Sequence, residues 1–317
     1  MAAAAPGRLA GSGRPLDVVV PAEPRRGRSA ARRTWIFAWF GLAVLVVWEA
    51  VKWLGGVPWR FADVLGTGLA IDHSPPFRWG FATDLNLPHW FNIIGAMAAP
   101  VQRNAEDSLA QFLVGAAFYT WREAFIGFVV GALLGLALAT VFVHSRLAER
   151  AFVPYVVASQ TIPIVALAPM IVFAFGPNVT SVVVIATYLT FFPVTIAMIR
   201  GLRAPDPRSL ELMRSYAAGR WEIYRKVRLP ASLPYLFTAL KIAATASIVG
   251  AIIGEGPGGI PDGLGRAIIN FNQQYITGPE KLWAAILVSS LLGVAFFVLI
   301  RVMELFSLRG RPGAAEG

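Results

Sequence analysis

The sequence predicts an all-α fold, a polytopic membrane helical bundle with about six transmembrane helices. Of its 317 residues, 56% are hydrophobic and only 15% are charged, whereas soluble domains carry about 25% charged residues. Residues 151–199 contain no charged side chain, although a single bilayer span needs only about 20 residues. These observations exclude a soluble enzyme, a disordered protein and a nucleic-acid-binding domain.

Cysteine and histidine usage excludes several kinds of site. The chain contains no cysteine, so it has neither disulfides nor a thiolate metal ligand. Its three histidines, His73, His89 and His144, are scattered along the sequence. The sequence therefore predicts no metal site.

The first part of the chain is expected to hold one span. Residues 1–33 lack a hydrophobic period, which predicts a disordered basic tail, and 34–54 are expected to form the first transmembrane helix. Residues 55–120 are interpreted as an outer loop. Its apolar patches at 91–99 and 109–119 are expected to be interfacial or to pack against the bundle.

Residues 121–308 are expected to form the core, with five further spans, followed by a short tail at 309–317. The uncharged run at 151–199 is too long for one span. The Gly-Pro-Asn sequence at 176–178 predicts a tight turn that divides this run into two helices. The remaining spans are expected at 124–143, 232–254 and 282–300.

The distribution of basic residues predicts how the chain is oriented in the membrane. Twenty of the 28 lysines and arginines fall in the amino-terminal tail, the 144–153 loop, the 200–230 segment and the carboxyl terminus. Because cytoplasmic loops are enriched in such residues, we expect both termini to be cytoplasmic. The net charge of +10 is thereby explained by topology.

Two patterns indicate how the helices pack. Gly127, Gly131 and Gly135 recur on one helical face, where missing side chains allow another helix to approach closely. A chance repeat in a glycine-rich span is the alternative. Prolines at 163, 169 and 193 predict kinks within the spans, of either functional or purely structural origin.

Residues 205–230 form a basic, amphipathic insertion. Leu210, Met213 and Ala217 share one helical face, and Glu211 lies beside it. Gly219 then breaks the helix, and Leu229 with Pro230 marks entry into the next span. The pattern predicts a surface helix that either docks on another protein or lies on the inner leaflet.

The stretch ELMRSYAAGRWEIYRKVRLP at 211–230 resembles the EAA loop of ABC-importer permeases. That motif reads E-A-A, three residues, G, nine residues, I-x-L-P. Glu211, Leu229 and Pro230 match in register, Val227 stands for the isoleucine, and Ala217 occupies the glycine position. Further similarity to the nitrate, sulfonate and taurine branch lies in EAFIGFVVG (123–131), SQTIPIVALAP (159–169), Phe192-Pro193 and the Gly-Leu-Gly at 263–265.

The resemblance implies a type I ABC-importer permease fold in a bacterial inner membrane. Such permeases pair as homodimers or heterodimers, dock their loop into a cytoplasmic ATPase and receive solute from an extracytoplasmic binding protein. This chain lacks the phosphate-binding motif GxxxxGK[ST], so it is expected to be no enzyme and to hold no cofactor. ATP and magnesium are then expected on the partner. Glu211 is expected to cap the surface helix and to meet basic or backbone donors on that ATPase, and a solvated surface carboxylate is the alternative.

Polar residues within or beside the spans are candidates for a translocation path or for docking. Path candidates are Gln160, Thr161, Tyr188, Thr190, Thr195 and Lys241; interhelical hydrogen bonding, or snorkelling of the lysine, is the alternative. Docking candidates for the binding protein are Glu255, Asp262 and Arg266, against ordinary loop polarity.

The alternatives to an importer permease are a secondary transporter and a channel-like protein. A secondary transporter usually carries buried acidic residues, and only Glu49 lies well inside a predicted span. No ring of charge or carbonyl filter indicates a channel. The few charges favour a small, neutral or weakly charged solute. The motifs at 159–163 and 271–275 resemble permeases for riboflavin or thiamine-precursor pyrimidines, with nitrate, sulfonate and taurine left open.

Overall fold

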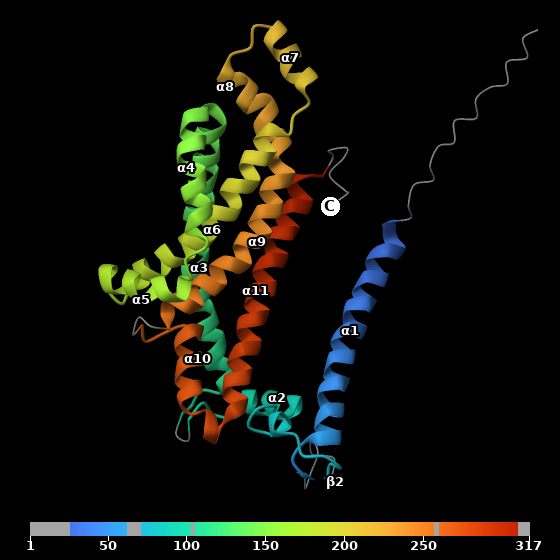
Figure 1. The fold of residues 1–317 in the computed structure, drawn as a ribbon. Coiled ribbons are helices and arrows are strands. Elements are labelled where there is room, and N and C mark those ends of the chain that lie inside the picture. Colours follow the sequence, from blue (N-terminus) through green and yellow to red (C-terminus); the bar gives the residue numbers. More distant parts are fainter. Residues whose placement is uncertain (1–25, 62–70, 103–104, 257–259, 310–317) are drawn as a thin grey trace, which may run out of the picture.

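The long helices run along a common axis, and one of them stands apart from the others (Figure 1). The structure is a computed structural model that describes residues 26–61, 71–102, 105–256 and 260–309. Its long helices are α1 (Arg26–Gly55), α3 (Leu109–His144), α6 (Val179–Arg203), α9 (Leu229–Glu255) and α11 (Pro279–Ser307). Its shorter ones are α2 (Trp90–Ala98), α4 (Arg146–Ser159), α5 (Ile164–Phe175), α7 (Pro207–Ser215), α8 (Arg220–Ile223) and α10 (Leu264–Gln273).

The ends of the molecule differ. The amino end of α1 and the carboxyl end of α11 point towards the end that carries α7 and α8 (Figure 1). The opposite end carries α2, α10 and a two-stranded antiparallel hairpin, β1 (Trp59–Phe61) and β2 (Ile71–His73). We call these the α7 end and the α10 end. The first residues of α1 and the last residues of α11 therefore lie on one side of the bundle.

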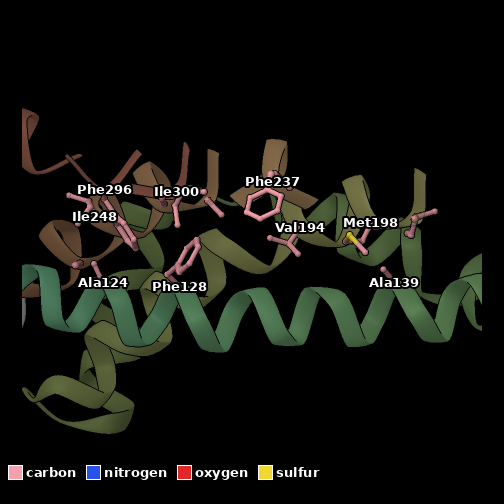
Figure 2. Close-up of a cluster of buried hydrophobic side chains, with 14 of the residues drawn as sticks. Ala124, Phe128, Ala139, Val194, Met198, Phe237, Ile248, Phe296 and Ile300 are labelled. Atoms are coloured by element: carbon pink, nitrogen blue, oxygen red, sulfur yellow. The ribbon is translucent and has the colours of Figure 1, made fainter. Parts of the chain in front are cut away.

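The centre of the bundle is the packing of α3, α6 and α9. Figure 2 shows apolar side chains from these helices and α11 meeting in one buried cluster, with Phe128, Phe237 and Phe296 among them. A second buried cluster at the α10 end joins Ile93 of α2 to Leu113 of α3 and to residues of α10 and α11. Two clusters thus span the bundle lengthwise.

Gly127, Gly131 and Gly135 lie where α3 crosses α6. A methyl group on Gly131 would come within 2.6 Å of the Thr190 Cβ and 2.8 Å of a backbone oxygen of α6. Methyl groups at the other two glycines would also meet α6 atoms at less than 3.0 Å. The two backbones therefore approach at a distance that leaves no room for side chains.

Five described helices are long and apolar enough to cross a membrane, and α4 with α5 pass the same test as a pair bent by 100°. We expected one helix, kinked at its prolines, before the turn at 176–178, and the structure instead has two helices there. The turn exists, with Gly176 at φ 83°, but the preceding run is also broken between Ser159 and Ile164. Pro163 lacks a backbone donor, so it begins α5 instead of continuing α4.

Two boundary predictions also need correction. Residues 109–119 are the first turns of α3, which starts at a capping box formed by Ser108 and Gln111. Residues 26–33, expected in the tail, belong to α1, while 1–25 and 310–317 lie outside the described residues. Residues 90–98 do form a short helix packed against the bundle, α2. Sequence reasoning ended the outer loop too late because the charged pair Arg122 and Glu123 interrupts the apolar run.

Candidate functional site

Helices α7 and α8 form a tip that projects beyond the bundle (Figure 1). Asp206 caps α7, since its Oδ1 accepts a hydrogen bond from the Arg208 amide at 2.9 Å, and Pro207 occupies the first helical turn. The expectation that Glu211 caps this helix is therefore wrong. Glu211 lies in the middle of α7 and is exposed.

The end of α7 explains one departure from the family motif. The Ala218 amide donates to the Met213 carbonyl at 3.0 Å and the Ala217 amide to the Arg214 carbonyl at 2.9 Å. This pair of bonds is a Schellman motif, which places one residue in the left-handed region. Ala217 has φ 55°, and it is the sole non-glycine with positive φ among the described residues. The position that the motif fills with glycine thus requires the conformation that glycine favours.

The exposed apolar face of the tip is not the predicted one. Leu210 and Met213 are half-buried, whereas Leu212, Tyr216 and Trp221 are 57%, 77% and 67% exposed. The predicted stripe was therefore partly wrong, because two of its members turn towards the chain. Leu212 and Tyr216 are four residues apart on α7 and so share a face. We call Leu212, Tyr216 and Trp221 the tip patch.

The tip joins the bundle through a five-residue π-helical turn, η2 (Tyr224–Arg228). Tyr224 is buried, and its hydroxyl lies 2.8 Å from the Thr140 hydroxyl of α3. The rings of Trp221 and Tyr224 stack at 5.1 Å. Gly219 precedes α8 as its N-cap, Val227 lies in η2, and Leu229 with Pro230 begins α9. The patch is thus linked to the bundle through directly contacting side chains.

Three path candidates gather at the break between α4 and α5. Gln160 and Thr161 lie in the break itself, and the Tyr188 hydroxyl of α6 donates to the Ser159 carbonyl at the end of α4. Thr161 is exposed, and its hydroxyl donates to the Ala158 carbonyl at 2.7 Å. The Gln160 side-chain nitrogen is buried and has no hydrogen-bond acceptor within the described residues.

The structure places the other three path candidates elsewhere. Thr190 and Thr195 are fully buried in the bundle, and the Thr195 hydroxyl donates to the Phe191 carbonyl at 2.7 Å. Lys241 binds the Glu304 carboxylate of α11 at 2.8 Å, with both side chains about four-fifths buried. Sequence reasoning missed Glu304, because the two residues are 63 positions apart. The six candidates therefore do not form one surface.

The three candidates for docking the binding protein do not lie on one surface either. Asp262 is exposed and Arg266 half-buried, and both line a pocket of about 290 Å³ between α3 and α10. Glu255 is fully buried at the end of α9, so the expectation that it docks a partner was wrong. Part of the region expected to be an outer loop is the helix α10.

The chain is similar to known membrane transport proteins. Residues 128–306 match the family described as "Binding-protein-dependent transport system inner membrane component". The chain is 35% identical to the formylaminopyrimidine transport permease of Halalkalibacterium halodurans over 182 residues, 56% of this chain and 70% of that protein. It is 33% identical to the riboflavin transport system permease of Chloroflexus aurantiacus, over 52% of this chain and 61% of the relative.

More distant similarity extends to a putative aliphatic sulfonates permease of Bacillus subtilis, 27% identical over 60% of this chain and 67% of that protein. Among solved structures, an amino acid ABC transporter crystallised with histidines matches at TM-score 0.51 and 20% identity. The match covers 62% of this chain and 94% of the other. At this identity the likeness concerns the fold alone.

Proposed function

This chain belongs to the family of binding-protein-dependent transport system inner membrane components, and we propose that its tip docks on a separate cytoplasmic ATPase. The chain is a multi-pass transmembrane permease subunit of an ABC importer, a transport subunit and not an enzyme. The tip patch carries the proposal. It consists of three large, mostly apolar side chains that remain exposed on a projection beyond the bundle.

The charges around the patch suit a groove on another protein. Arginines at 208, 214, 220 and 225 lie on the same segment, 207–228, and are exposed, and Glu211 lies on α7 with Leu212 and Tyr216. Aromatic side chains supply most of the affinity at such interfaces, and charges at the rim set orientation. The tip patch therefore holds the ATPase, and Glu211 with the arginines fixes its angle.

Orientation and assembly complete the proposal. The α7 end is cytoplasmic, both termini lie on that side, and the α10 end receives the extracytoplasmic binding protein at Asp262 and Arg266. A second permease copy, identical or related, completes the path. The break between α4 and α5 contributes Gln160 and Thr161 to this path, because the Gln160 side-chain nitrogen has no acceptor among the described residues and Thr161 is exposed beside it.

The solute is a small heteroaromatic compound of the pyrimidine or flavin kind. The relatives named for such solutes are 35% and 33% identical, above the 27% of the sulfonate permease. The few charges in the spans suit a neutral or weakly charged compound. Uptake by reconstituted complexes with the cognate binding protein tests this. Preference for sulfonate or nitrate would contradict it.

The docking experiment introduces Tyr216→Asp and Trp221→Asp together. Each buries a carboxylate at the interface without a partner, at a cost of about 2 kcal/mol or more. We expect the ATPase to be lost from purified complexes. The control is Ile276→Asp, an 84% exposed apolar position at the α10 end, which should retain the ATPase. Full ATPase retention in the double variant would contradict the assignment of the tip.

Orientation is tested with single cysteines, which this cysteine-free chain permits. Ser74 and Ser209 are both exposed and lie at opposite ends of the molecule. Cysteine at 74 should react with an impermeant maleimide in intact cells, and cysteine at 209 only after lysis. The reverse pattern would invert the proposed topology.

A further inference from the structure

Two carboxyl groups are buried side by side at the α10 end of the bundle. Glu123 lies on α3 and Glu255 is the last residue of α9, and both side chains are fully buried. Glu255 and Thr120, which lies one helical turn before Glu123 on α3, accept from the adjacent Gly265 and Leu264 amides, so the two carboxyl groups lie beside the same turn and interact electrostatically. Two ionised carboxylates in such a site would repel one another with little solvent to screen them.

Glu255 has a defined structural task. Its Oε2 accepts a hydrogen bond from the Gly265 amide at 2.6 Å, and the Thr120 hydroxyl accepts one from the Leu264 amide at 2.8 Å. These amides belong to the first turn of α10, whose N-cap, Gly263, offers no side chain. Residues of α3 and α9 therefore cap α10 from outside the helix.

The turn before α10 is built around this carboxylate. Gly263 has φ 99°, and a methyl group there would lie 2.4 Å from the Glu255 carboxyl carbon. A methyl group on Gly265 would lie 2.2 Å from the Ile252 carbonyl oxygen. Only glycines at both positions leave room for the Glu255 side chain, so the contact is a specific feature of this turn.

Glu123 lacks an equivalent donor. Neither of its oxygens has a hydrogen-bond donor with normal geometry in the described part of the chain. The ionisable groups nearest it are the Glu255 carboxyl, the Tyr119 hydroxyl, Arg122 and Asp262. Arg122 is exposed and lies over the Tyr119 ring at 5.1 Å. From α6, the contacts to the adjoining Gly254 are the apolar Val182 and Ile185.

We propose that Glu123 and Glu255 share one proton and form a carboxyl latch that holds the first turn of α10 against α3. With one proton, the protonated carboxyl donates to the other, which keeps a charged oxygen for the Gly265 amide. A pocket of about 290 Å³ is lined by Tyr119, Asp262, Gly263 and Arg266, and Gly263 in turn packs on the Glu255 carboxyl. Loss of the proton restores the repulsion and releases α10.

The latch has a consequence for transport, and this step alone rests on the proposed function. Asp262 and Arg266, the docking residues, flank the capped turn. A binding protein that pulls on them acts on α10, and the closed latch transmits that pull to α3. Import should then depend on outer pH, since a deprotonated latch leaves α10 free.

Infrared spectroscopy of the full-length protein in nanodiscs tests the shared proton directly. We expect a carbonyl band of a buried protonated carboxylic acid that disappears at alkaline pH. It should be absent from both Glu123→Gln and Glu255→Gln, whose amides retain a donor and an acceptor and so preserve the fold. Glu106→Gln, exposed at the same end, should keep the band. No such band in the wild type, or its persistence in both variants, would overturn the latch.

Uptake by proteoliposomes containing the whole complex tests the consequence. Wild-type import should fall severalfold as outer pH rises, and Glu123→Gln, whose side-chain amide keeps a hydrogen-bond donor at every pH, should flatten that profile. Equal profiles in the two proteins would overturn the regulatory role. A complex that shows the infrared band but imports nothing under any condition would instead contradict the proposed function.

Discussion

Helices α3 and α1 are both long and apolar enough to cross a membrane, yet they are held in different ways. In the most apolar 18-residue window, 33% of α3 is buried within the protein and only 11% of α1. Helix α3 packs along its length on α6 through Gly127, Gly131 and Gly135. Helix α1 leaves Trp39 and Phe40 exposed and meets the rest of the chain at its α10 end (Figure 1).

The contacts of α1 are polar and aromatic. The Lys52 ammonium is fully buried and donates to the Asp84 carboxylate at 2.5 Å and to the Leu87 carbonyl at 2.6 Å. The Glu49 carboxylate lies 2.7 Å from the His89 ring, and the Trp48 ring nitrogen donates to the Pro88 carbonyl at 3.0 Å. Because lipid is as apolar as a helix surface, burial alone does not hold α1. Backbone proximity holds α3, and a few directed bonds at one end hold α1.

The largest effect is expected from Gly131→Ala. The added methyl would contact Thr190 and the α6 backbone at less than 3.0 Å, so α3 and α6 must separate. We expect a loss of about 2–3 kcal/mol from overpacking. Thermal unfolding in detergent measures it. Gly41→Ala on α1, where nothing lies within 4 Å, is the matched control and should be neutral or slightly stabilising. Equal effects at the two glycines would remove the distinction between α3 and α1.

Asp84→Asn should loosen only the attachment of α1 to the 84–90 segment. The buried Lys52 ammonium would keep the Leu87 carbonyl but lose its carboxylate, at a cost of about 1–2 kcal/mol because Asp84 is itself 54% exposed. We expect faster hydrogen exchange at 84–90 and unchanged exchange in α3 and α6. Asp72→Asn, an exposed carboxylate of β2, is the control. Faster exchange throughout the bundle would show that α1 is part of the core.

Part of the difference between the packing of α3 and that of α1 can be predicted from the sequence. The four-residue glycine repeat predicts close packing because spacing alone places those residues on one helix face. The start of α3 at Leu109 was missed because Arg122 and Glu123 look like a membrane boundary. In the structure Arg122 is exposed whereas Glu123 is buried against Glu255, and no local pattern reveals that difference.

The sites depend on contacts between distant residues. Thr120 meets Leu264 across 144 positions and Lys241 meets Glu304 across 63, so a single sequence shows neither pair. The tip was predicted from its amphipathic pattern, but its exposed face was assigned from Leu210 and Met213. The pattern identifies which residues share a face. The pattern does not say which face points outward. That depends on how the chain turns at Ala217, and the family motif, which has glycine at this position, does not reveal it.

The tip resembles α1 in that few contacts hold it, and the smallest predicted effect lies there. Ala217→Gly removes the steric cost of an L side chain in the left-handed region, about 1–2 kcal/mol. Glycine also gives the unfolded chain more conformational entropy than alanine does. This favours unfolding and offsets about 0.4–1 kcal/mol of that stabilisation. The net stabilisation of the Schellman motif is therefore about 0.5–1 kcal/mol, which corresponds to roughly two- to fivefold slower exchange of the 217 and 218 amides. Ala218→Gly, at a residue without positive φ, should have the opposite sign. A slower exchange in both variants would mean that backbone strain at Ala217 does not limit the tip.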